Sequence, residues 1–275
     1  MTEHKAEEYK MRQAAIDRIT PEMFAGYCLE GRFGEEEALK AYGEALPKAM
    51  EAASDPGEKT GLWYVYNMGF IAKSEKCLFS LDLSHPLAHT YADKLDFAWI
   101  THHHGDHFTE AYYHRMNNEL KKTVVSNFAD NYGAHFAGSE FGGGYTHGGK
   151  DFMFRDVPLH TAASDHNDYL LDFTLTMEFT LGGLHIYHTG DSAHVEKLNP
   201  TQRPDIWIVH PRCGLDVREG YEKFRPEVTV IAHLNEMGHA RDRWRWSYED
   251  GLEEAEKIRA LGGKAIVPLW GDRIL

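Results

Sequence analysis

The sequence predicts a layered fold of the mixed α/β (α+β) class built around one large domain. Three observations support this class. Helix-forming residues dominate residues 1–55, short β-rich runs begin at residue 62, and a capped helix and one more β-rich run close the 275-residue chain. Strands and helices that mix along a chain in this way favour layers of sheet and helix that share a core.

The first part of the chain has a helical pattern. Thr20 is a capping residue followed by a proline at the first helical position. Residues 34–54 are rich in helix formers, and Pro47 predicts a break or kink in their helix. The turn-rich "DPGEKTG" comes next. We therefore expect a helical N-terminal extension, residues 1–58, packed on a main domain of residues 59–275.

Short β-rich runs separated by turns begin after this extension. Residues 62–85 contain three of them in a meander-like pattern. Residues 110–122 predict a helix, and residues 247–263 predict another with a Ser-x-x-Asp capping box and a C-terminal glycine. The glycine-rich residues 133–150 predict a surface loop. Further strands are predicted for "DFAWIT", "TVVSNF", "DFMFRDVPLHTAA", "YLLDFTLTMEF", "LHIYH", "DIWIVH", "VTVIAH" and "KAIVP".

Composition limits the classes of function. Acidic residues outnumber basic ones 43 to 29, for a formal charge of −14, which argues against duplex nucleic acid as the main partner. No run approaches the ~18 apolar residues of a membrane span, and the charged N-terminus lacks the apolar core of a secretory signal. The three cysteines are widely spaced and form no CxxC pair. These features predict a reduced, cytoplasmic protein.

The stretch "THHHGDHF", residues 101–108, directly follows an apolar strand. Imidazole and carboxylate are preferred ligands of transition metals. In an extended segment alternate residues point the same way, so His102 and His104 can converge on one ion while His103 points away. After the turn at Gly105, Asp106 and His107 can face a second ion. So many ligand-type residues predict more than one metal position.

Three later strand ends also carry ligand-type residues. They are "SDHND" at residues 164–168, "YHTGDS" at residues 187–192, and "VTVIAHLNEMGH" at residues 228–239. The tips of hydrophobic strands are where sheets of this class place functional loops. We expect the four segments to meet at one edge of the fold.

The order of these motifs resembles the metallo-β-lactamase superfamily over residues 62–275. The match consists of H-x-H-x-D-H, a strand-end His, a G-D pair and a late strand-end His. "YHTGDS" and the closing "IVPLWGD" further resemble the branch that contains L-ascorbate-6-phosphate lactonase. The resemblance implies a four-layer αββα sandwich with its site at one edge.

The resemblance also implies a ligand set for two divalent ions. His102, His104 and a middle histidine would hold the first ion, for which we choose His166 over His160 because it lies 25 positions before Asp191. Asp191 would bridge both ions. The ligands implied for the second ion are Asp106, His107 and His233, with His239 as the alternative to His233. In the lactonase branch the middle position need not be histidine, so occupancy by one metal stays open.

The implied chemistry is metal-dependent hydrolysis. A metal-bound hydroxide would cleave an ester, lactone or phosphoester in a small metabolite, which can itself be phosphorylated. Asp106 and His107 are the candidate catalytic residues, with Asp106 orienting the nucleophile or shuttling its proton. Zinc is the expected metal, with manganese or iron as alternatives. No G-x-S-x-G elbow is present.

Other interpretations remain open at this stage. They are an iron-dependent oxidoreductase or dioxygenase on the same fold, a nuclease or phosphodiesterase, and a non-catalytic metal-binding protein. Arg212 and His194 are candidate substrate contacts. Residues 239–247, "HARDRWRWS", predict either an anion pocket with aromatic walls or a loop that caps the core. The N-terminal helices either cover the sandwich or form a homo-oligomer contact.

Overall fold

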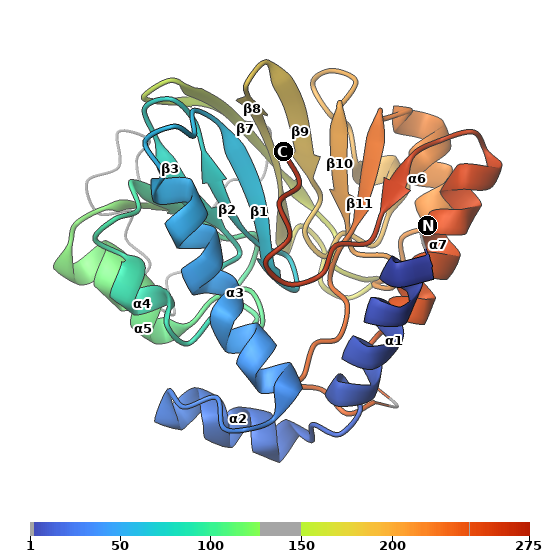
Figure 1. Cartoon of the computed structure of the whole chain (residues 1–275). Helices are drawn as coiled ribbons and strands as arrows, with labels where there is room; N and C mark the ends of the chain where they lie inside the picture. Colours follow the sequence, from blue (N-terminus) through green and yellow to red (C-terminus); the bar gives the residue numbers. More distant parts are fainter. Residues whose placement is uncertain (1–2, 127–149, 242) are drawn as a thin grey trace.

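The computed structural model describes residues 3–126, 150–241 and 243–275, and it contains two β-sheets with helices on their outer sides (Figure 1). Almost all of the loop predicted for residues 133–150 lies outside the described residues. The α/β class and the four-layer αββα arrangement predicted from the sequence are confirmed. Among the described helices, none is both long and apolar enough to cross a membrane.

The first sheet has five strands in the order of the sequence. The chain runs antiparallel from β1 to β3 and parallel from β3 to β5. The strands are β1 (Gly61–Tyr66), β2 (Gly69–Lys73), β3 (Leu78–Leu81), β4 (Phe97–Trp99) and β5 (Thr123–Val125). The three β-rich runs predicted within residues 62–85 are therefore confirmed as β1–β3.

The second sheet has seven strands in the order β12-β11-β10-β9-β8-β7-β6. Its antiparallel half, β6–β9, continues into a parallel half, β9–β12. The strands are β6 (Lys150–Phe154), β7 (Val157–Ser164), β8 (Thr174–Leu181), β9 (Leu184–His188), β10 (Ile206–Val209), β11 (Val228–Ile231) and β12 (Ala265–Ile266).

Aromatic side chains join the two sheets. Phe79 on β3 stacks on Phe97 of β4, with ring centroids 4.5 Å apart, and meets Phe179 of β8 edge-on at 5.6 Å. Trp99 of β4 also contacts Phe179. All four rings are buried, and large aromatic rings dominate the energetics of such cores. These rings thus connect β3 and β4 of the first sheet to β8 of the second.

Helices cover both outer faces of the sandwich. On the first sheet, α3 (Glu37–Ser54) packs on β1 and β2, and α4 (Ala88–Tyr91), α5 (Glu110–Tyr113) and a π-helical turn (His114–Glu119) lie farther along. On the second sheet, α7 (Tyr248–Ala260) packs on β11 and β12 beside α6 (Val217–Phe224), and a short 3₁₀ turn (Val195–Lys197) follows β9. The Ser247 capping box predicted for α7 is present.

The sequence predicts a break or kink at Pro47, and the break is wrong, because helix α3 continues through this residue. Its apolar face, which includes Leu39, Leu46 and Met50, is fully buried. Proline in a helix interior removes one backbone hydrogen bond at a cost of about 3 kcal/mol. Burial of several large side chains at ~1.5–3 kcal/mol each outweighs that cost, so tertiary packing keeps the helix intact.

Helices α1 (Glu3–Ile16) and α2 (Pro21–Glu30) lie across the lower side of the molecule in Figure 1. The buried guanidinium of Arg245 holds the link between them. It donates from Nη1 to the carbonyl oxygen of Ile19 at 2.6 Å, from Nη2 to that of Met237 at 2.7 Å, and from Nε to that of Glu236 at 3.2 Å. Charged donors make the stronger class of hydrogen bond, so α2 is fixed against the loop after β11.

Candidate metal centre

The ligand-type residues predicted from the four strand ends meet at one edge of the sandwich. Backbone hydrogen bonds connect the two sheets there, from Leu175 to the carbonyl of Thr101 and from His233 to that of Asn67, both at 2.9 Å. His233 has a left-handed backbone, with φ 55°, which turns the chain sharply after β11. A side chain at Gly190 would collide with Thr101, so only glycine allows this close approach. These backbone contacts hold the strand-end loops of the two sheets next to each other.

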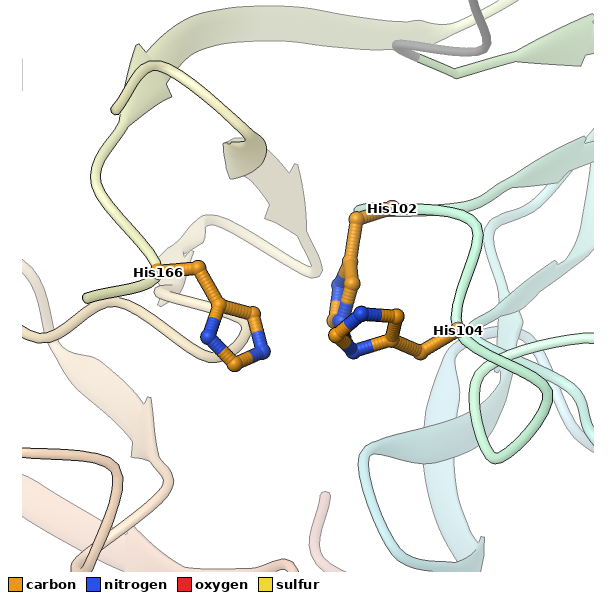
Figure 2. Close-up of side chains that lie close together, drawn as sticks. All are labelled: His102, His104 and His166. Atoms are coloured by element: carbon orange, nitrogen blue, oxygen red, sulfur yellow. Dashed lines mark hydrogen bonds between the residues drawn. The ribbon is translucent and has the colours of Figure 1, made fainter. Parts of the chain in front are cut away.

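The first cluster consists of His102, His104 and His166. His102 Nε2 lies 3.0 Å from His104 Nδ1, and the ring of His166 lies 5.0 Å from that of His102 and 4.8 Å from that of His104. Figure 2 shows His166 facing the other two rings from a separate segment. One ring nitrogen from each residue lies within 4.8 Å of the others. The three nitrogens can hold one cation.

Thr101 fixes the tautomer of His102. The Thr101 hydroxyl donates to Asp82 Oδ2 at 2.8 Å, so it can only accept from His102 Nδ1, which lies 3.0 Å away. A neutral imidazole that donates from Nδ1 keeps a free lone pair on Nε2. Burial lowers the pKa of His102 well below its usual value and that of His104 to about 4. Both residues are therefore neutral at pH 7, as metal ligands must be.

The second cluster consists of Asp106, His107, Asp191 and His233. His233 Nε2 donates to Asp106 Oδ2 at 3.1 Å, and His107 Nε2 lies 3.3 Å from Asp191 Oδ2. Burial alone would raise the pKa of Asp106, but the neighbouring His107 and His233 outweigh it and keep the carboxyl ionised. Burial alone would lower the pKa of His107, yet the carboxylates of Asp191, Asp106 and Asp82 raise it well above its usual value. A cation here would compete with that proton.

Asp191 lies between the two clusters. Its Oδ2 is 3.3 Å from His107 Nε2 and 3.6 Å from both His233 Nε2 and His166 Nε2. Within the described part of the chain, Asp191 Oδ1 and His166 Nε2 are buried without a hydrogen-bond partner. A buried polar atom left in this way costs about 1–3 kcal/mol, which ligation of a cation would offset. The donor set therefore fits a pair of divalent ions that share Asp191.

Asp82, which the sequence reasoning missed, orients the second cluster. It accepts hydrogen bonds from the Thr101 amide at 2.6 Å and from His107 Nδ1 at 2.9 Å. The second bond directs His107 Nε2 toward Asp191, as carboxylate partners of metal-binding histidines commonly do. Its signal in the sequence is an acidic residue at the end of the apolar run "CLFSLD".

Replacing Asp82 with asparagine is expected to lower the zinc affinity of the second cluster about 10–100-fold, because His107 loses its charged partner. Competition with a chromophoric chelator measures that affinity. Asp96→Asn is the matched control, because Asp96 precedes β4 at the end opposite the cluster and accepts from the Leu78 amide. Equal affinities of the wild type and Asp82→Asn would contradict this role.

Several other histidines lie outside both clusters. His160 contacts Asp151 at 2.8 Å, and His103 lies against Phe173 with ring centroids 4.7 Å apart. His239 pairs with Glu236 on a cavity wall. Of the candidates for a middle and a late ligand, His166 and His233 lie in the two clusters, whereas His160 and His239 lie outside them.

His210 is a further residue that the sequence reasoning did not single out. Its ring stacks on that of His233, with centroids 3.9 Å apart and planes at 13°. Its Nδ1 accepts from the Arg212 amide at 3.1 Å, which fixes the ring orientation. Its only signal in the sequence is its place at the end of the apolar run "DIWIV". His210 lines the same cavity as the two clusters.

A cavity of about 840 Å³ opens onto both clusters. Of the two candidate substrate contacts, Arg212 lines it, whereas His194 does not and instead contacts Asp165 and Asp168 at 3.1 and 3.0 Å. Residues 239–247 contribute His239, Trp244 and Trp246 to the wall.

No protein-family model matches this chain, and no curated protein matches its sequence. The structure is similar to that of Igni18, a metallo hydrolase from Ignicoccus hospitalis, with 19% identity, a TM-score of 0.58 and coverage of 79% of this chain and 98% of Igni18. YhfI of Bacillus subtilis, a metallo-β-lactamase fold protein, is 13% identical with a TM-score of 0.59, and the match covers 79% of this chain and 100% of YhfI. CmlA, a diiron β-hydroxylase of Streptomyces venezuelae, is 13% identical with a TM-score of 0.56, and the match covers 79% of this chain and 54% of CmlA.

The likeness to these three structures extends over most of this chain, and YhfI is covered over its whole length. It agrees with the two sheets and their outer helices described above. The chain has the metallo-β-lactamase fold.

Proposed function

We propose that this protein is a metal-dependent hydrolase that cleaves an ester, lactone or phosphoester bond in a small molecule. One observation carries the proposal: Asp191 Oδ2 lies within 3.6 Å of ligand nitrogens from both clusters. Two divalent ions bound there would lower the pKa of a shared water toward ~7 and polarise the oxygen that gains charge. Zinc is the first choice of metal for this histidine-rich donor set, with manganese or iron as alternatives.

The residues of the chain have separable roles in this proposal. His102, His104 and His166 would hold the first ion, while Asp106, His107 and His233 would hold the second. Asp106 Oδ2, which accepts from His233, is placed to take the proton of the attacking water. His210 and Arg212 line the cavity and can contact substrate.

Removal of metal is the direct test of the proposed function. Protein stripped with a chelator is expected to lose hydrolysis of esters, lactones and phosphodiesters, and to regain it as about two equivalents of zinc per chain are added back. Activity and bound metal are measured on the same samples, with magnesium as the control cation because it prefers oxygen ligands. Hydrolytic activity that is unchanged after removal of the metal would contradict the proposal.

An iron-dependent oxidoreductase is the second candidate. The observation that favours it is the donor set, because imidazole and carboxylate also suit iron. CmlA, a diiron hydroxylase, has a similar fold, although only about half of that chain is covered. Oxygen uptake by iron-loaded protein, without hydrolysis by zinc-loaded protein, would favour this candidate. A nuclease is disfavoured by the formal charge of −14.

A further inference from the structure

Part of the cavity wall away from the two clusters is apolar. Helix α2 of the N-terminal extension contributes Phe24, Ala25 and Cys28, and the segment before α7 contributes Trp244 and Trp246. Leu170, Pro86 and Tyr66 complete the apolar lining. The same cavity is also lined by polar residues outside the clusters, namely Ser84, Thr109, Asn167, His210, Arg212, Glu236 and His239. A cavity of this size that combines aromatic walls with placed polar groups is typical of small-molecule sites.

The exposure and the backbone conformation of Trp244 are both unfavourable for the stability of the fold. The residue is 63% exposed, although its side chain is one of the largest apolar ones. Its backbone is left-handed, with φ 59°, a conformation that bulky residues rarely adopt. Backbone strain of this kind clusters at functional sites, and Trp244 lies on the cavity wall. A ligand that covers the ring would remove the first of the two penalties.

The one arginine on the wall already faces several carboxylates. Arg212 is the only Lys or Arg among the described residues that line the cavity. Its Nη2 lies 3.3, 3.5 and 3.6 Å from carboxylate oxygens of Asp250, Glu253 and Glu254, all on α7. Glu236 adds a carboxylate to the wall itself. Arg212 Nε is buried without a hydrogen-bond partner among the described residues, but the charge of the guanidinium faces the three carboxylates on α7. A phosphate distant from the reacting bond would compete with them for this one guanidinium, whereas phosphates are bound best by guanidinium groups that are free to bind them with two nitrogens.

Helix α2 is a fixed wall and not a loose flap. Arg245 binds the carbonyl of Ile19 just before the helix, and Thr20 caps it by accepting from the Met23 amide. Phe24 packs against the buried rings of Tyr42 and Tyr66, at 5.3 and 6.0 Å between centroids. A preformed wall lowers the cost of ordering on binding.

We propose that the cavity binds a substrate whose body, away from the bond to be cleaved, is uncharged and apolar or aromatic and lies against α2 and the two tryptophans, with the scissile bond at Asp191. This substrate class rests on the proposed hydrolysis at the same site. It narrows the substrates by excluding those that carry a phosphate away from the scissile bond. The N-terminal extension thereby acts as a specificity element.

The test uses a pair of naphthyl esters that differ only in a phosphate on the distal ring. Wild-type protein loaded with zinc is expected to prefer the uncharged ester by at least about 100-fold in kcat/KM, because the only guanidinium on the described walls already faces three carboxylates and a dianion there would be poorly compensated. Ala25→Trp, which fills the cavity from α2, is expected to lower kcat/KM for the uncharged ester at least about 10-fold. Leu29→Trp is the matched control, because Leu29 lies on the same helix and is 89% exposed.

Binding is measured separately from hydrolysis. Uncharged and phosphorylated naphthyl amides, which resist cleavage, are titrated into His104→Ala protein and followed by tryptophan fluorescence. The uncharged amide is expected to bind more tightly, and less tightly when Ala25→Trp is added. If no ester is hydrolysed but this binding pattern holds, the proposed function fails and the pocket assignment stands. Equal or tighter binding of the phosphorylated amide, or folded Ala25→Trp protein that behaves like Leu29→Trp, would overturn the inference.

Discussion

Replacing Asp191 with alanine is expected to remove both bound ions and to lower kcat/KM by about 10³-fold or more. The reason is its position, since the same carboxylate oxygen lies close to His107, His166 and His233. Loss of one carboxylate therefore weakens both clusters at once. Metal per chain and kcat/KM, measured on the same protein, check this expectation.

Asp168→Ala is the matched control for Asp191→Ala. Asp168 belongs to the loop that carries His166, but its side chain is 82% exposed and pairs with His194. The control is expected to keep both metal content and activity. A variant Asp191→Ala that still holds two ions per chain would show that the carboxylate is not shared between them.

The neighbouring histidines 103 and 104 are expected to respond in opposite ways to alanine. His104→Ala should lose the first ion and about 10²-fold or more in kcat/KM, because one of three nitrogens in that cluster is gone. His103→Ala should retain both ions, because His103 lies outside the clusters beside Phe173. The two variants differ in position by a single residue, so general loss of histidine cannot explain a difference.

Metal analysis and single-turnover hydrolysis on both variants provide the measurement. The informative result is which of the two variants loses more metal and activity. If His103→Ala loses metal while His104→Ala keeps it, the alternation along the strand end has been assigned the wrong way round.

The proximity of His102 and His104 could be predicted because both lie on one extended segment, where alternate side chains share a side. Distant partners could be expected to approach only because each ends an apolar strand. The choice of His166 over His160 depended on spacing, and the structure brings His166 to the cluster while His160 pairs with Asp151. Local periodicity thus predicted only the first pair, whereas the order of the motifs, through the family resemblance, implied the distant members of the two clusters.

Contacts between distant segments could not be predicted in the same way. Asp82 lies 25 positions before His107, and nothing in its own segment indicates a histidine partner. The pairing of Arg212 with carboxylates of α7 depends on how that helix packs, which no local pattern encodes. The same is true of α3, where tertiary burial overrides Pro47. The place of α2 on the cavity wall also follows from packing alone.

A crystal structure of zinc-loaded protein, with anomalous diffraction recorded at the zinc edge, tests the central claim most directly. Two peaks are expected, one among His102, His104 and His166 and the other among Asp106, His107 and His233. The carboxylate of Asp191 should contact both. Zinc bound only at sites that Asp191 does not reach, or no bound zinc at all, would contradict the account.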